Sequence, residues 1–195
     1  MAQLKDTTIN DTIVLGTGSE STPSLTFTGN TNTGIFRPDT DQIAFSTNGT
    51  ERMRIDSLGR QTRPFQPMFN VFRNVNSFSP SANSIFPHNA ARINVGNHFN
   101  LSTHRFTAPV AGNYWFTFET IQIGSVSSGT IRYRLNGSVL FGSSRHWGND
   151  TGGWVSIKIT KLIAMNVNDF VDVILVTATT YHGNAWNAFC GYLVG

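Results

Sequence analysis

The chain has 195 residues, with 14 Lys+Arg against 11 Asp+Glu, a formal net charge of +3 and only 13% charged residues. Its polarity comes from neutral groups, because Thr, Asn, Ser and Gly together supply 77 residues. This composition excludes a disordered tail, which would lack the 15 Phe, and a long coiled coil, which would be rich in Ala, Glu, Lys and Leu. No stretch approaches about 18 consecutive apolar residues, so we expect no membrane insertion.

The first part of the chain predicts an attachment segment followed by a small β module. Residues 1–22 hold short apolar runs, and their start lacks the apolar core of a signal peptide, so we expect synthesis in the cytoplasm. Within residues 23–63, apolar and polar side chains alternate in four short strands with turns at 29–34 and at Asn48-Gly49. A module this small buries too little apolar surface to be stable alone, so we expect it to pack on its own copies or on a neighbouring domain.

The second part predicts one β-sandwich. Residues 64–68 form a proline-flanked linker, and residues 69–195 contain roughly eight strands separated by turn signals every 8–15 residues. Asn136-Gly137 stands between two strands and predicts a hairpin. We therefore expect an all-β protein whose C-terminal domain is an antiparallel sandwich or barrel.

Residues 69–195 resemble a C1q-type domain, of the jelly-roll superfamily shared with tumour necrosis factor. The resemblance rests on four stretches: 95–100, the run Phe-Thr-Ala-Pro-Val-Ala-Gly-Asn-Tyr-Trp-Phe at 106–116, Leu-Asn-Gly at 135–137, and Phe-Cys-Gly-Tyr-Leu at 189–193. The resemblance implies an antiparallel jelly-roll sandwich that forms a homotrimer.

Residues 23–60 are similar to a short β-rich module that recurs in bacteriophage tail-fibre and virion-appendage proteins. The matching stretches are 23–36, 41–49 and 54–60. This second resemblance implies a protein located in the virion, in which residues 1–22 contact other virion proteins. Phage fibres are usually trimeric, so both resemblances imply threefold symmetry.

The strand at 113–121 agrees with such an assembly. A sandwich buries one face of each strand, yet aromatic side chains occur at consecutive positions and therefore on both faces of this one. A second apolar face needs another subunit. We expect the trimer interface to include aromatic residues of this strand and of the C-terminal part of the chain: Tyr114, Trp115, Phe116, Phe118, Trp186 and Tyr192.

Catalytic and metal-binding patterns are not found in the sequence. It contains neither His-Glu-x-x-His nor Gly-x-Ser-x-Gly, and its five His and one Cys show no zinc-finger spacing. We expect no enzyme, no catalytic residue, no metal and no cofactor. The basic residues are too scattered for nucleic acid. Cys190 fits a small buried thiol, and Glu119 and Asp172 lie within strands, where carboxylates face solvent or pair with a cation.

Two predicted loops, 145–150 and 180–184, combine aromatic rings with neutral hydrogen-bonding groups, as carbohydrate sites do. The candidate receptor- or glycan-binding residues are His146, Trp147, Asn149, Asp150, Tyr181, His182 and Asn184. Such aromatic side chains also close the end of a sandwich or fill a subunit interface, and that alternative stays open.

The sequence thus favours a trimeric phage fibre or appendage that attaches to a host cell-surface glycan or other receptor. One alternative keeps the fold and the trimer but gives the protein only a structural role, as a capsid or tail decoration or adaptor. A second alternative is a secreted bacterial C1q-like lectin.

Overall fold

A computed structural model describes residues 12–124, 126–140, 144–150 and 153–195; the side chains of 126–128, 144–150 and 185 lie outside this description. The chain divides into two compact units, Met1–Phe65 and Gln66–Gly195, and the division falls within the predicted linker at 64–68. Among the described residues, no helix is long and apolar enough to cross a membrane.

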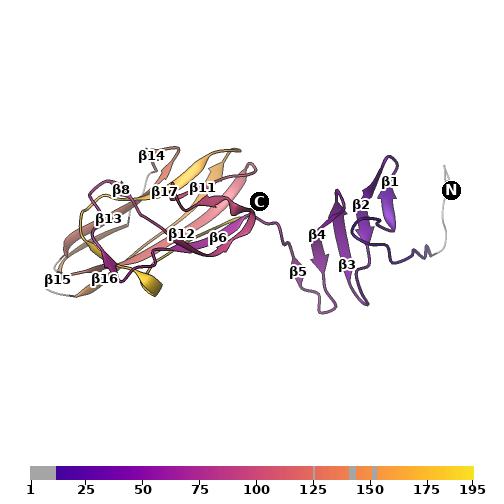
Figure 1. Cartoon of the computed structure of the whole chain (residues 1–195), viewed down its shortest axis with the longest axis horizontal. Coiled ribbons are helices and arrows are strands. Elements are labelled where there is room, and N and C mark those ends of the chain that lie inside the picture. The colour runs from indigo at the N-terminus through magenta and orange to yellow at the C-terminus, as the bar shows by residue number, and fades with distance from the viewer. Residues whose placement is uncertain (1–11, 125, 141–143, 151–152) are drawn as a thin grey trace. The chain divides into compact units, whose positions relative to one another are not determined.

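The first unit is a five-stranded antiparallel sheet whose strands follow one another in chain order (Figure 1). Its strands are β1 (Leu25–Phe27), β2 (Asn30–Phe36), β3 (Ile43–Thr47), β4 (Thr50–Ile55) and β5 (Gln61–Thr62). The predicted hairpin at Asn48-Gly49 is confirmed, because both residues have positive φ and join β3 to β4. The predicted turn at 29–34 is confirmed only at its start: Gly29 has positive φ in the turn between β1 and β2, whereas residues 30–34 belong to β2 and pair with β1 or β3.

Among the described residues, one face of this sheet is covered more completely than the other. Phe36, Ala44 and Ser46 are buried on one side. On the other side, the strand register aligns four apolar side chains, Leu25, Ile35, Phe45 and Met53, across β1 to β4. Ile43 and Ile55 pair beside them and remain 41% and 36% exposed. We call these six residues the open face of the first unit.

The second unit is a sandwich of two seven-stranded antiparallel sheets. The first, the β12 sheet, contains β6 (Met68–Phe72), β7 (Ser77–Phe78), β9 (Ala90–Asn94), β12 (Gly112–Ile123), β16 (Trp154–Met165), β18 (Thr180–His182) and β19 (Ala188–Leu193). The second, the β17 sheet, contains β8 (Ser84–Ile85), β10 (Phe99–Asn100), β11 (Arg105–Thr107), β13 (Val126–Leu135), β14 (Ser138–Val139), β15 (Ser144–Asp150) and β17 (Phe170–Leu175). Two short 3₁₀ helices, η1 (Val95–Asn97) and η2 (Asn184–Trp186), complete the described elements.

The order of the long strands gives the sandwich its connectivity. The β12 sheet runs β9-β6-β19-β12-β16, and the β17 sheet runs β10-β11-β17-β13-β15, so consecutive strands often cross from one sheet to the other (Figure 1). The predicted antiparallel jelly-roll sandwich is therefore confirmed. The Asn136-Gly137 hairpin is confirmed as well, with positive φ at both residues between β13 and β14.

Aromatic side chains fill the space between the two sheets. Phe69, Phe106, Phe116 and Phe189 contact one another, with ring centroids 4.8–6.1 Å apart in each contact. Gly191 lies against this group, and a Cβ there would overlap the rings of Phe69 and Phe116. The closed core leaves the outer faces of the sheets as the surfaces available for function.

Candidate functional site

An apolar row crosses the outer face of the β12 sheet. Strand pairing places Leu162 of β16 beside Trp115 of β12, Trp115 beside Tyr192 of β19, and Tyr192 beside Met68 of β6. The exposed fractions are 62% for Leu162, 42% for Tyr192 and 37% for Met68. The Trp115 and Tyr192 rings pack together with centroids 5.5 Å apart. These four residues form a continuous apolar surface that the described residues of the second unit leave largely open.

An aromatic cluster lies farther along the same face. Trp154, His182 and Trp186 have ring centroids 4.9–5.5 Å apart, and the two indoles remain about half exposed. A hollow of about 210 Å³ borders the cluster and is lined by Glu119, Thr120, Ile121, Ser156 and Trp186. Between the apolar row and the cluster lies a polar band, in which the hydroxyls of Thr117 and Thr160 are 3.1 Å apart. The face thus offers two apolar areas separated by hydrogen-bonding groups.

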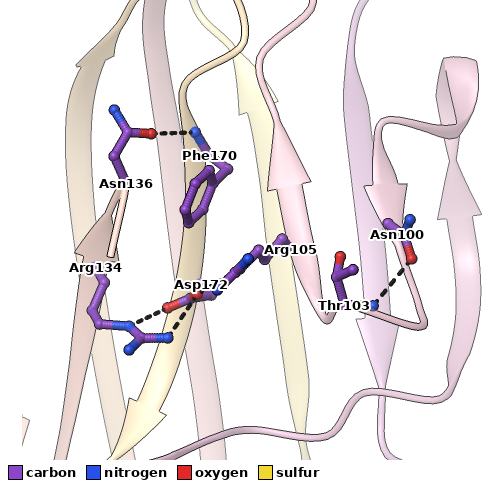
Figure 2. Close-up of polar contacts among 7 residues, drawn as sticks. All are labelled: Asn100, Thr103, Arg105, Arg134, Asn136, Phe170 and Asp172. Carbon is purple, nitrogen blue, oxygen red and sulfur yellow. Dashed lines mark hydrogen bonds and ion pairs between the residues drawn. The ribbon is translucent and has the colours of Figure 1, made fainter. Parts of the chain in front are cut away.

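The outer face of the β17 sheet differs from that of the β12 sheet, because charged side chains lie at its centre. Asp172, at the centre of β17, is completely buried and lies between Arg134 of β13 and Arg105 of β11 (Figure 2). Arg134 donates from Nε to Oδ1 at 2.7 Å and from Nη2 to Oδ2 at 2.9 Å, and Arg105 donates from Nε to Oδ2 at 3.0 Å. Of the two roles that the sequence leaves open for Asp172, facing solvent or pairing with a cation, the structure shows the second.

The structure reassigns three of the predicted interface residues. Tyr114, Phe116 and Phe118 point into the sandwich and are completely buried, so they stabilise the subunit rather than the trimer. The Tyr114 hydroxyl donates to the carbonyl of Val110 at 2.8 Å, and burial raises the pKa of this phenol. The remaining candidates, Trp115, Trp186 and Tyr192, lie on the outer face of the β12 sheet. Sequence alternation found both faces of β12 but could not decide which one the core would use.

Three of the five residues of the second predicted binding loop, 180–184, belong to a strand. Residues 180–182 form β18, and Tyr181 is completely buried, with burial raising the pKa of its hydroxyl. Tyr181 therefore belongs to the core, and its prediction as a receptor-binding residue is wrong. His182 joins the aromatic cluster, and Asn184 Nδ2 donates to Asn76 Oδ1 at 2.8 Å.

The backbone of the first predicted loop, 145–150, also forms a strand. Residues 144–150 form β15 and pair with β13, with Trp147 opposite Ser128 and His146 opposite Gly129. The side chains of the four candidates there, His146, Trp147, Asn149 and Asp150, lie outside the described part of the structure. The loop assignment failed because neutral polar residues with two glycines nearby read as a turn, whereas β-pairing decides the conformation.

The apolar row could not be predicted as a surface from the sequence. Leu162 and Met68 do not indicate an interaction surface by themselves, because single exposed apolar residues are common on protein surfaces. Only the register places them beside Trp115 and Tyr192. No group of three or more His, Cys, Asp or Glu in the described residues could hold a metal ion.

The comparisons with known proteins match the second unit to domains of the same fold. The family model described as the C1q domain matches residues 68–194. The globular domain of zebrafish complement 1qA is 18% identical, with a TM-score of 0.56, and the match covers 67% of this chain and 98% of that one. The Eiger TNF of S. frugiperda is 10% identical, with a TM-score of 0.59 and coverage of 68% and 94%. Murine APRIL is 11% identical, with a TM-score of 0.52 and coverage of 66% and 98%. No curated protein matches the chain.

Proposed function

Because this chain belongs to the C1q domain family through residues 68–194, we propose that it forms a homotrimer that binds and displays rather than catalyses. The observation that carries the proposal is the apolar row on the β12 sheet. Exposed contiguous apolar side chains mark interaction sites, and each Å² buried contributes about 25 cal/mol. Around a threefold axis, the apolar row of each subunit packs against the neighbouring subunits. All three rows are then buried, and the assembly is closed.

The open face of the first unit supports the same assembly. Its six residues carry no charge, so identical faces approach one another without like-charge repulsion. A hollow of about 540 Å³ extends from this face and is lined in part by Leu15, Leu25, Ile35 and Ile43. Trimerisation of the second unit holds three first units at high effective concentration, which favours their packing.

We propose further that the trimer is a phage fibre or appendage located in the virion. Residues 1–22 then contact other virion proteins, and the second unit presents three copies of its surface to the host cell. What supports this role is the phage-type pattern at 23–60 and the neutral Thr, Asn, Ser and Gly surface. Weak contacts to a repetitive surface glycan add together when three identical sites bind at once.

Antibody labelling of purified particles tests the role. We expect the antibody to label one appendage of the particle, and the purified protein to block adsorption to host cells. Particles without label would contradict a place in the virion and would favour the secreted lectin. Label without any effect of Trp147→Ala on adsorption would favour a decoration or adaptor protein. The variant must first be shown to remain trimeric.

Cys190 is a natural probe of the trimer interface. It pairs with Thr117 across the outer face of the β12 sheet, next to the apolar row, and partial burial raises the pKa of its thiol. We expect the trimer to react with a thiol reagent at least about tenfold more slowly than a monomeric variant at the same pH, because the partner subunit covers this face. Equal rates for trimer and monomer would place the interface elsewhere.

A further inference from the structure

The outer face of the β17 sheet carries more positive charge than its carboxylates neutralise. Arg105, Arg132 and Arg134 lie on this face, and we call them the arginine row. Asp172 is the carboxylate between two of them, and Asp169 lies at the start of β17. Even with both carboxylates counted, three guanidiniums leave a positive surplus.

Hydrogen bonding leaves several guanidinium donors of the row unused. Arg134 uses Nε and Nη2 on Asp172, and Arg105 uses only Nε. Among the described residues, Nη1 of Arg134, both Nη groups of Arg105 and the whole guanidinium of Arg132 have no hydrogen-bond partner. Asp169 is occupied elsewhere, since it accepts from Asn136 Nδ2 and from the backbone N–H of Asn166.

The two paired arginines are held in place before any ligand arrives. Asp172 is fully buried and fixes both guanidiniums, whose side chains are 35% exposed for Arg105 and 20% exposed for Arg134. The Arg105 guanidinium also stacks over the Phe170 ring at 4.3 Å, and Figure 2 shows both residues beside Asp172. Side chains that are already ordered lose little entropy when they bind, which strengthens the interaction.

The charge of the whole second unit reinforces the local surplus. Residues 66–195 contain eight Lys and Arg against four Asp and Glu, a net charge of +4, whereas residues 1–65 carry six against seven, a net charge of −1. The remaining described carboxylate of the second unit, Glu119, lies on the other sheet and pairs with Lys158 at 3.7 Å. The second unit as a whole therefore attracts anions, and of its two outer faces the proposed trimer leaves the β17 face open.

We propose that the arginine row binds the carboxylates of an acidic polysaccharide. Guanidinium forks match the planar carboxylate and bind it through two hydrogen bonds. The row lies on a sheet face that the trimer proposed above leaves open, so three copies face outward and suit a polymer with repeated charges. This inference rests on the proposed attachment function and names the class of its ligand.

The test uses the full-length protein and a galacturonic acid oligomer, with a neutral galactose oligomer of equal length for comparison. Arg132→Gln removes a guanidinium that has no partner among the described residues. Arg105→Gln removes one of the two guanidiniums that pair with Asp172, and Arg134 still pairs with this carboxylate. The matched control is Arg92→Gln, on the β12 sheet, where the guanidinium stacks over Phe72 at 3.9 Å. Light scattering first shows that each variant is trimeric.

We expect the wild type to bind the acidic oligomer at least about tenfold more tightly than the neutral one, with an affinity that falls as salt screens the charges. Arg132→Gln and Arg105→Gln should each weaken binding about tenfold, and Arg92→Gln less than about twofold. Equal losses in all three variants would mean only general attraction to a basic protein and would overturn the site. Failure of the wild type to prefer the acidic oligomer would overturn it too.

A cell-binding assay separates this inference from the function on which it rests. If labelled wild-type trimer does not bind host cells, the attachment function fails. If the trimer binds cells and Arg132→Gln and Arg105→Gln bind equally well, only the acidic-polysaccharide site fails.

Discussion

Leu162→Asp is expected to convert the trimer into a folded monomer with a mass near 21.5 kDa. The Leu162 side chain is 62% exposed in the subunit, so the change costs the monomer little. In the trimer the same position lies within the apolar row, where each subunit would bury an unpaired carboxylate. Burial of an unpaired charge costs several kcal/mol, and threefold symmetry repeats the cost at every interface.

Light scattering measures the mass, and circular dichroism establishes that the variant is folded. The matched control is Val139→Asp, which places the same charge at a residue 47% exposed on β14 of the opposite sheet. We expect the control to stay trimeric. A trimer that survives Leu162→Asp, or that dissociates equally in both variants, would show that the β12 face is not the interface.

His88 is expected to make the second unit sensitive to acid. Its ring is completely buried among Phe86, Phe99, Phe118 and Phe189, and neither ring nitrogen has a hydrogen-bond partner in the described part of the chain. Burial, and then repulsion from His104, lower its pKa from 6.5 to about 3. The neutral imidazole is therefore the form that the folded core accepts.

The sign of the effect follows from proton uptake. Above pH 6.5 His88 is neutral in both the folded and the unfolded chain, so stability does not depend on it. Below that pH, His88 is protonated in the unfolded chain, whereas in the folded protein it stays neutral down to about pH 3. The free energy of unfolding then falls by about 1.4 kcal/mol for each pH unit, which amounts to roughly 2 to 3 kcal/mol at pH 4.5.

His88→Leu removes this titration while keeping a side chain of similar volume. We expect the variant to be at least as stable as the wild type at pH 7.5, because it leaves no unpaired ring nitrogens in the core. At pH 4.5 it should exceed the wild type by a further 2 kcal/mol or so in urea unfolding. His98→Gln, at a half-buried histidine of the same unit, serves as the control and should keep the wild-type slope. Parallel pH profiles for wild type and His88→Leu would refute the assignment.

Local rules predicted the elements whose conformation depends on neighbouring residues in sequence. Asn48-Gly49 and Asn136-Gly137 adopt positive φ whatever the rest of the chain does, so their hairpins could be predicted. Apolar and polar side chains alternate from Val155 to Ile159, which is typical of a strand, and in the structure this strand extends to Met165. The resemblance to C1q-type domains, which rests in part on the motif at 106–116, implied the antiparallel jelly-roll sandwich that the structure shows.

Sites that depend on contacts between distant strands could not be predicted in the same way. Arg105, Arg134 and Asp172 lie far apart in sequence, and three strands must pair in one register before their charges meet. Tyr181 and Tyr114 show the opposite failure: their composition suits a surface or an interface, but the sandwich needs their volume inside. Sequence reasoning found the aromatic residues and could not assign each one to a face.

The register of the β17 sheet gives Asp172 a consequence beyond ligand binding. Its neighbours in sequence, Val171 and Val173, are completely buried in the core, so alternate positions of β17 face opposite sides. Sliding β17 by one residue against β11 and β13 would direct the carboxylate among phenylalanines and leave both arginines facing apolar side chains. A mispaired sandwich therefore carries an electrostatic cost in addition to the exposure of Val171 and Val173. We therefore expect Asp172 and its two arginines to favour the observed register of β17 over a register shifted by one residue.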